Sequence, residues 1–144
     1  MSPKILSVLA FLVLVAVLFY LALTGQIFGG PVTTTLQVAA VLLMVWARIT
    51  FGKRSFHAAA NPTEGGLVTT GPYRYVRHPI YAAVLLFFAA GIAAHPSWIN
   101  AALGLVAFGA LLVRMLAEEK LVVQQYPEYA EYARRTKRVI PWVF

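Results

Sequence analysis

The residues best suited to chemistry gather around one proline-led helix start. Arg77 and His78 precede Pro79, and Tyr81 follows two residues later. Proline is favoured at the first position of a helix, so this spacing places Arg77 and His78 at a helix N-terminus. The free N–H groups and the dipole of such an end attract anions, so a carboxylate or phosphate site is one interpretation. Taken singly, each residue also fits a plainer role as a membrane-flanking charge, a helix cap or an interfacial aromatic ring.

A second group carries charges of both signs. Arg114 and Glu118 are four residues apart and share one face of a helix, and Glu119 follows directly. Arg114 lies in the last turn of an apolar run, where an unpaired charge is costly, so we expect it to face a polar cavity. The alternative is a solvated helix end whose Arg–Glu pair contributes little to stability.

Four apolar runs must position these groups. The chain has 144 residues, of which 60% are hydrophobic and 12% charged, and it has no cysteine. This balance excludes an ordinary soluble enzyme, and the lack of cysteine excludes disulfides and thiolate chemistry. A bilayer core requires about 20 apolar residues, and backbone groups in lipid must be satisfied within the segment. The sequence therefore predicts an all-α, polytopic membrane protein that forms one domain, residues 1–144. It should have four membrane spans: Ile5–Leu23, Val32–Ile49, Pro79 to Ala94 or His95, and Trp98–Leu116.

The distribution of charge predicts the orientation of these spans. Every Lys, Arg and Glu falls at the chain's start, in the connection 50–78, in the tail 117–144 or at the helix ends beside them. With four spans these segments share one side of the membrane, which the positive-inside rule makes cytoplasmic. Both termini and the site are then cytoplasmic, at the plasma or inner membrane in a prokaryote or the endoplasmic reticulum in a eukaryote. The net charge of +7 reflects this asymmetry and contact with membrane lipids rather than nucleic-acid binding.

The tail predicts one further helix. It should start near Pro127, after the fourth long helix ends at about Gln125, and run to about Lys137. Tyr129 and Tyr132 share a face, and an interfacial amphipathic helix would turn them toward the bilayer. The three histidines, His57, His78 and His95, lack the spacing of a metal site, so no metal is expected, and His57 and His95 are interpreted as structural.

Two blocks of the sequence resemble one known family. The first is Gly71-Pro72-Tyr73-Arg74-Tyr75-Val76-Arg77-His78-Pro79-Ile80-Tyr81, and the second is Arg114-x-x-x-Glu118-Glu119-Lys120-Leu121. With Tyr126-Pro127-Glu128-Tyr129-Ala130-Glu131-Tyr132 and Arg138-Val139-Ile140-Pro141, they resemble the isoprenylcysteine carboxyl methyltransferase and phospholipid methyltransferase superfamily over roughly residues 60–141. One departure is Ala83, where many members have glycine.

The resemblance implies an integral membrane methyltransferase that uses S-adenosylmethionine (SAM) and releases S-adenosylhomocysteine. It implies that Arg114 faces the acceptor and that Glu118 and Glu119 shape the reaction centre. The residues that it implies for cofactor binding lie in the loop Leu67–Tyr73, the proline-led segment and the fourth helix: Leu67, Val68, Tyr73, Arg77, His78, Pro79, Tyr81 and Glu118.

The acceptor is the least constrained part of this prediction. A lipophilic acceptor entering from the bilayer is expected, most simply the carboxylate of an isoprenylcysteine-like molecule. A phospholipid amine of the phosphatidylethanolamine type is the main alternative. A small transporter is disfavoured because no span has an acidic residue at its centre, and a membrane reductase would need a nicotinamide cofactor. The sequence leaves the oligomeric state open.

Overall fold

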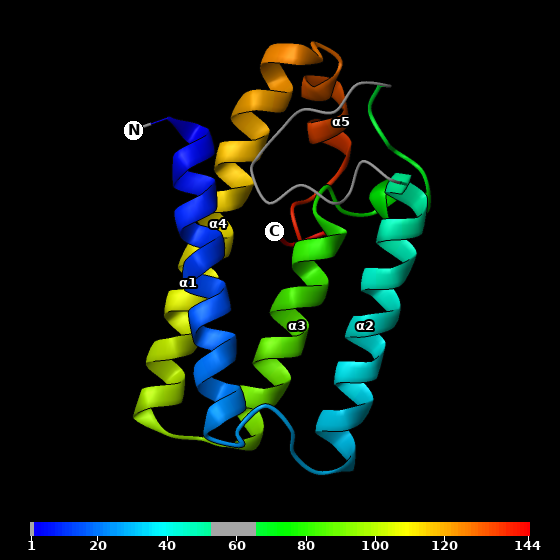
Figure 1. The fold of residues 1–144 in the computed structure, drawn as a ribbon. Coiled ribbons are helices and arrows are strands. Elements are labelled where there is room, and N and C mark those ends of the chain that lie inside the picture. Colours follow the sequence, from blue (N-terminus) through cyan, green and yellow to red (C-terminus); the bar gives the residue numbers. More distant parts are fainter. Residues whose placement is uncertain (1, 53–65) are drawn as a thin grey trace.

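The structure, a computed structural model, describes residues 2–52 and 66–144 and forms a bundle of long helices (Figure 1). The elements are α1 (Pro3–Leu23), α2 (Pro31–Phe51), the short 3-10 turn η2 (Gly71–Arg74), α3 (Pro79–Ala94), α4 (Trp98–Gln125) and α5 (Tyr129–Arg135). No strand occurs in the described residues beyond one isolated bridge between Val76 and Lys137. The predicted all-α, polytopic membrane architecture is confirmed.

Local sequence signals start each long helix. Proline occupies the first position of α1, α2 and α3, where its missing N–H breaks no helical hydrogen bond. Serine hydroxyls cap α1 and α4: Ser2 Oγ accepts from the N–H of Ile5 at 3.3 Å, and Ser97 Oγ accepts from the N–H of Asn100 at 3.1 Å. The expected helix at Pro79 is thus observed, with His78 as its cap.

Within residues 2–52 and 66–144, three helices have the length and hydropathy to cross a membrane, namely α1, α2 and α4. Helix α3 is apolar but has only 16 residues, or about 24 Å at 1.5 Å per residue, which is shorter than a bilayer core. Helix α4 continues to Gln125, as predicted. The last helix begins at Tyr129 rather than near Pro127, because Pro127 and Glu128 form a turn before it, and it ends at Arg135.

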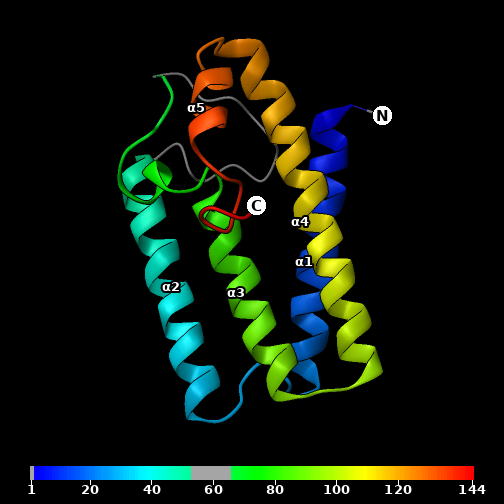
Figure 2. The ribbon, with the colours of Figure 1, turned by 180° about the vertical axis from the view of Figure 1, so that it is seen from behind.

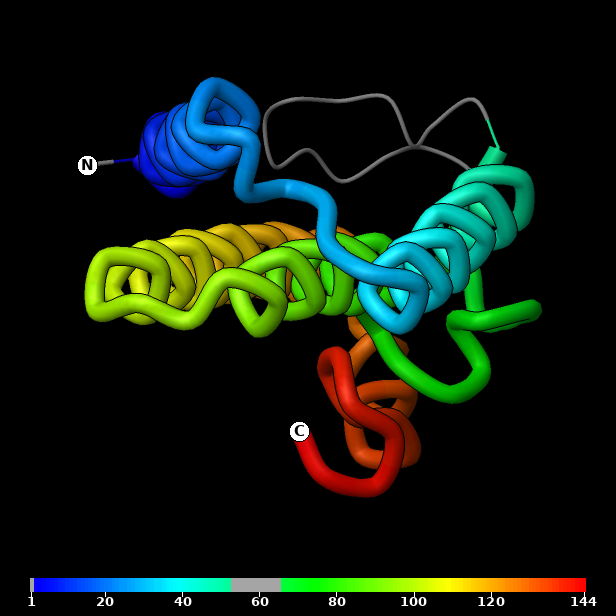
Figure 3. Tube along the Cα trace, turned by 90° about the horizontal axis from the view of Figure 1, so that it is seen from below, coloured from blue at the N-terminus to red at the C-terminus, as the bar shows by residue number. Residues whose placement is uncertain are grey.

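The long helices pack as two pairs. Helix α1 lies against α4 and α2 lies against α3, while α3 and α4 join the pairs (Figures 1 and 3). Leu14 and Leu21 of α1 are buried with Ala107 and Ala110 of α4. The small alanine side chains let the two helix backbones approach closely, which favours packing between apolar helices in lipid.

The two ends of the bundle differ in chemistry. The N-terminus, η2 and α5 lie at one end, and the connections 24–30 and 95–97 lie at the other (Figure 1). In the described part of the chain, every Lys, Arg and Glu belongs to the first end. The cytoplasmic assignment of that end remains a prediction.

The opposite end is held by hydrogen bonds. His95 Nε2 lies 2.7 Å from the carbonyl oxygen of Phe28, and Asn100 donates to Gln26 Oε1 at 2.6 Å. His95 therefore has the structural position expected of it, whereas His57 lies outside the described residues. Gly91 of α3 lets this connection approach closely, because a Cβ there would meet the carbonyl oxygen of Ile27 at 2.7 Å.

We predict that Gly91→Ala lowers stability by about 1–3 kcal/mol, since the clash is with backbone and a well-packed site tolerates extra volume poorly. Gly109→Ala in α4 is the matched control, because a Cβ there meets nothing within 4 Å and alanine favours helix. Thermal unfolding in detergent micelles measures both. Equal melting temperatures for the two variants would contradict the close approach.

Candidate active site

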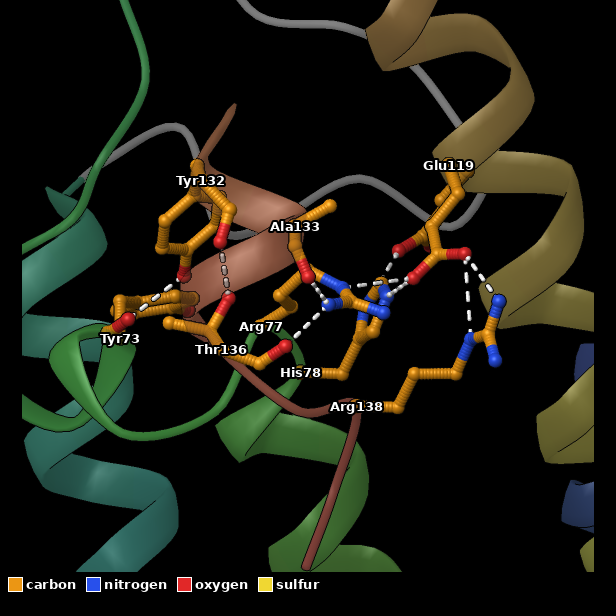
Figure 4. Close-up of polar contacts among 9 residues, drawn as sticks. Tyr73, Arg77, His78, Glu119, Tyr132, Ala133, Thr136 and Arg138 are labelled. Atoms are coloured by element: carbon orange, nitrogen blue, oxygen red, sulfur yellow. Dashed lines mark hydrogen bonds and ion pairs between the residues drawn. The ribbon is translucent and has the colours of Figure 1, made fainter. Parts of the chain in front are cut away.

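A single carboxylate joins three segments at the charged end of the bundle. Glu119 of α4 accepts from Arg77 Nε at 3.0 Å and from Arg138 Nη2 at 2.9 Å (Figure 4). His78 Nε2 lies 3.2 Å from the same carboxylate. Both carboxylate oxygens are therefore engaged, and the side chain is 13% exposed. Glu119 connects α4, the start of α3 and the C-terminal segment.

Arg77 is held on two further sides. Its Nη1 donates to the carbonyl oxygens of Ala133 at 2.7 Å and Thr136 at 2.5 Å, where α5 ends. These carbonyls lack partners within their own helix, so the cation satisfies them. Its side chain is 9% exposed. Arg77 therefore fastens α5 and the tail to the segment before α3.

The backbone reinforces this attachment. The N–H of Arg77 donates to the carbonyl of Lys137 at 2.7 Å, and the N–H of His78 donates to that of Arg138 at 2.9 Å. The C-terminal segment thus runs beside the start of α3 (Figure 2). Farther along, the ring of Phe144 lies 6.5 Å from that of Phe108 on α4.

A second network faces the interior of the bundle. Arg114 Nε donates to Tyr81 Oη at 3.0 Å, and Tyr81 in turn donates to Glu118 Oε1. Arg114 Nη2 lies 3.6 Å from the same Glu118 oxygen. Glu118 Oε2 is 3.9 Å from His78 Nδ1, and its side chain is 25% exposed, about twice the fraction of Glu119. Glu118 is therefore the more available of the two carboxylates.

A cavity of about 520 Å³ opens beside this network. It is bounded by α1, α2, α3 and α4, by residues 66–68 and η2, and by tyrosines that follow α4. Charged side chains lie at one end, and apolar side chains, both aliphatic and aromatic, form most of the rest, which is the usual composition of a small-molecule site. All the residues predicted for cofactor binding or catalysis line it: Leu67, Val68, Tyr73, Arg77, His78, Pro79, Tyr81, Arg114, Glu118 and Glu119. The cavity position expected for Arg114 is confirmed; the role of each residue remains a prediction.

The tyrosines face inward rather than toward lipid. Tyr129 and Tyr132 of α5 line the cavity, and Tyr132 donates to the carbonyl of Tyr73 at 2.6 Å. The expectation that α5 turns these rings to the bilayer is wrong, because Arg77 holds the end of α5 over the cavity. Tyr73 and Tyr81 are likewise part of the cavity wall rather than an interfacial belt, whereas Tyr75 is 52% exposed.

Burial keeps these phenols protonated. It raises the pKa of Tyr132 to about 12, although the positive charge of Arg77 lowers it. Burial also raises the pKa of Tyr73 and of Tyr129, with the charge of Glu119 adding to the effect at Tyr129. These phenols are therefore neutral side chains in the cavity wall.

Several lining residues were not anticipated from the sequence. Helix α1 contributes Phe11, Leu14, Val15 and Leu18, and α2 contributes Arg48 at its charged end. The α1 residues recur at helical spacing, but α1 is apolar on every face, so this spacing does not stand out in the sequence. Arg138 was assigned to a closing motif, and its partner Glu119 could not be identified from spacing alone.

The family model described as phospholipid methyltransferase matches residues 26–129, which is more than half of the chain. The chain belongs to the phospholipid methyltransferase family. The match extends from the connection after α1 to the first residue of α5, so it contains η2, α3 and all of α4. Glu118 and Glu119, the acidic residues of the two charged networks, both lie within the matched residues.

Two curated bacterial proteins are similar to this family member over about half of its length. The cobalt-zinc-cadmium resistance protein CzcN of Cupriavidus metallidurans is 38% identical over 77 residues, 52% of this chain and 35% of that protein. The nickel-cobalt-cadmium resistance protein NccN of Alcaligenes xylosoxydans xylosoxydans is 36% identical over 76 residues, 52% of this chain and 36% of that protein. The chain thus matches about a third of each relative's length. No solved structure matches it.

We predict that Glu119→Gln lowers stability by about 3–5 kcal/mol, because Arg77 is then left buried without its counter-ion. Glu131→Gln is the matched control, since it removes an exposed pair with Arg135 that is worth at most about 1 kcal/mol. Denaturant unfolding in micelles measures both. A Glu119→Gln variant as stable as Glu131→Gln would contradict the structural role of this carboxylate.

Proposed function

We propose that the protein transfers a methyl group from SAM to a lipophilic acceptor, most simply the carboxylate of an isoprenylcysteine-like molecule. The observation that carries this proposal is the juxtaposition of Arg114, Tyr81 and Glu118 with an apolar cavity between membrane helices. Membership of the phospholipid methyltransferase family supports the reaction class. The cavity supports an acceptor with a hydrocarbon part.

The donor set of the cavity fits SAM. The cofactor carries a sulfonium, an ammonium and a carboxylate, and it supplies an electrophilic methyl group when bound. Glu118 offers a partly available carboxylate for a cationic group. The aromatic rings of Tyr73 and Tyr129 in the cavity wall would suit a cationic group. His78 Nε2 already lies 3.2 Å from Glu119, so the backbone N–H groups at the start of α3, rather than the imidazole, are placed to hold a carboxylate.

We assign Arg77 a different role from the direct cofactor binding that the resemblance implies. Its Nε and Nη1 are already engaged by Glu119 and two carbonyls. We therefore expect Arg77 to support the cofactor site mainly by fixing His78 and α5. Its direct contact with a cofactor carboxylate stays a prediction.

Arg114 is the residue that would orient the acceptor. The residue is 5% exposed, and its side chain lies in the wall of the cavity. A buried cation attracts a carboxylate and can align it for in-line displacement, where correct alignment supplies much of the acceleration. A carboxylate nucleophile needs no base, so Glu118 is not required to accept a proton in this reaction.

A phospholipid amine is the second candidate acceptor. The family description favours it, and so does Glu118, whose carboxylate could take the proton that an attacking amine must lose. The two acceptors give different products. Transfer of labelled methyl to N-acetyl-S-farnesyl-cysteine gives a base-labile ester, whereas transfer to phosphatidylethanolamine vesicles gives a base-stable N-methyl headgroup.

We expect a base-labile product from the purified protein, and a roughly 10²–10³-fold loss of kcat in Arg114→Gln, comparable to removal of one electrostatic stabiliser from other active sites. Arg134→Gln on the exposed face of α5 is the control. Retained binding of S-adenosylhomocysteine by Arg114→Gln shows that the variant is folded. A base-stable product would show that the acceptor is the amine and not the carboxylate. The absence of methyl transfer to either acceptor would contradict the proposal.

A further inference from the structure

Helix α1 forms part of the cavity although the family match begins only at residue 26. Its contribution is one face, Phe11, Leu14, Val15 and Leu18, with the spacing of a single helical stripe. The matched part of the chain therefore supplies the charged networks, while a helix outside the match supplies an apolar wall. Such a wall can differ between proteins without altering the reacting groups.

Two contacts with Arg114 determine the position of α1 along the bundle axis relative to the charged networks. Arg114 Nη1 donates to the carbonyl oxygen of Ser7 at 3.0 Å. The guanidinium carbon of Arg114 also lies 5.3 Å from the centre of the Phe11 ring, a cation–π distance. Phe11 is therefore level with Arg114, and the later residues of the stripe lie progressively deeper between the helices.

Three helices give the same depth for the apolar part of the cavity. The stretches Phe11 to Leu18 on α1, Tyr81 to Phe88 on α3 and Glu118 to Leu111 on α4 each span seven residue-to-residue steps, or about 10 Å at 1.5 Å per step. Half of a hydrocarbon core is about 15 Å. The cavity thus reaches from the charged end through much of one leaflet.

The deep end of the cavity is closed. Beyond Leu18, Leu21 and Ile27 meet Phe88 without room for a water molecule, and Leu21 is 2% exposed. At the side, α1 packs mainly against α4 and α2 mainly against α3, and both α1 and α2 line the cavity (Figure 3). We expect an acceptor from the bilayer to enter on the side where α1 and α2 face each other.

We propose that α1 is the wall that selects the acceptor, with its Phe11–Leu18 stripe binding the hydrocarbon chain next to the reactive group. This inference rests on the proposed function. The occupant is a hydrocarbon chain because the stripe is apolar, lies at membrane depth and continues directly from Arg114 and Glu118. A prenyl chain and a fatty acyl chain share this chemistry, and the experiment distinguishes them.

The test places a bulky residue at the deep end of the stripe. In Leu18→Trp we expect the KM for N-acetyl-S-farnesyl-cysteine to rise about tenfold, while the Kd for S-adenosylhomocysteine stays within twofold. The KM for the shorter N-acetyl-S-geranyl-cysteine should rise less, and Leu18→Ala should not raise either value. If methyl transfer is instead to phosphatidylethanolamine, the same comparison is made with short-chain and long-chain forms of that lipid.

Leu12→Trp is the matched control, because Leu12 is 54% exposed on α1 and does not line the cavity. A benzophenone-bearing analogue of S-farnesyl-cysteine supplies a readout that does not need catalysis. Light should cross-link it within residues 3–23, and excess N-acetyl-S-farnesyl-cysteine should prevent this. Equal KM values for the two tryptophan variants, or competable cross-links only outside α1, would overturn the proposal. Competable cross-linking to α1 without any methyl transfer would support binding of the hydrocarbon chain by α1 and would contradict the proposed methyltransferase activity.

Discussion

The attraction of one largely buried carboxylate for three cationic or proton-donating partners organises the charged end of this protein. Glu119 lies on α4, whereas Arg77 and His78 precede α3 and Arg138 belongs to the C-terminal segment. A buried ion pair repays its loss of hydration only when its geometry is good and its remaining hydrogen-bonding groups are satisfied. Here both carboxylate oxygens are engaged, and Arg77 also caps the end of α5. The cavity keeps its shape at this end because these segments cannot separate without exposing an unpaired charge.

Two adjacent glutamates consequently do different work. Successive residues on a helix point about 100° apart, so Glu119 faces the C-terminal segment while Glu118 faces Tyr81 and Arg114. The first stabilises the arrangement and the second remains available at the cavity. Below them the wall is apolar, which suits the proposed reaction between a charged cofactor and an acceptor anchored in lipid. Helix α1 joins both regions, since it touches Arg114 at Ser7 and Phe11 and then continues as apolar wall.

Much of this could be predicted from the sequence because membrane insertion imposes strong local rules. Apolar length indicated the four helices, and Pro79 indicated the start of α3 to the residue. Because a charge in an apolar turn is costly, Arg114 was expected to face a cavity, and it lines one in the structure. The partner of each charge could not be predicted, because Glu119 and Arg77 are 42 residues apart and only the tertiary fold selects Arg138 as well. The inward direction of Tyr129 and Tyr132 was missed for the same reason: amphipathic spacing indicates a face, but the buried Arg77 determines which way it turns.

The most direct test of the account is calorimetric titration of the detergent-purified protein with S-adenosylhomocysteine, comparing Glu118→Gln with Glu128→Gln. Glu118 lines the cavity and Glu128 is exposed beside α5, so the same loss of charge is made inside and outside the site. The account predicts binding by the wild type and by Glu128→Gln, and at least about tenfold weaker binding by Glu118→Gln, which corresponds to about 1.4 kcal/mol. Equal affinity in the two variants, or no binding by a folded wild type, would contradict it.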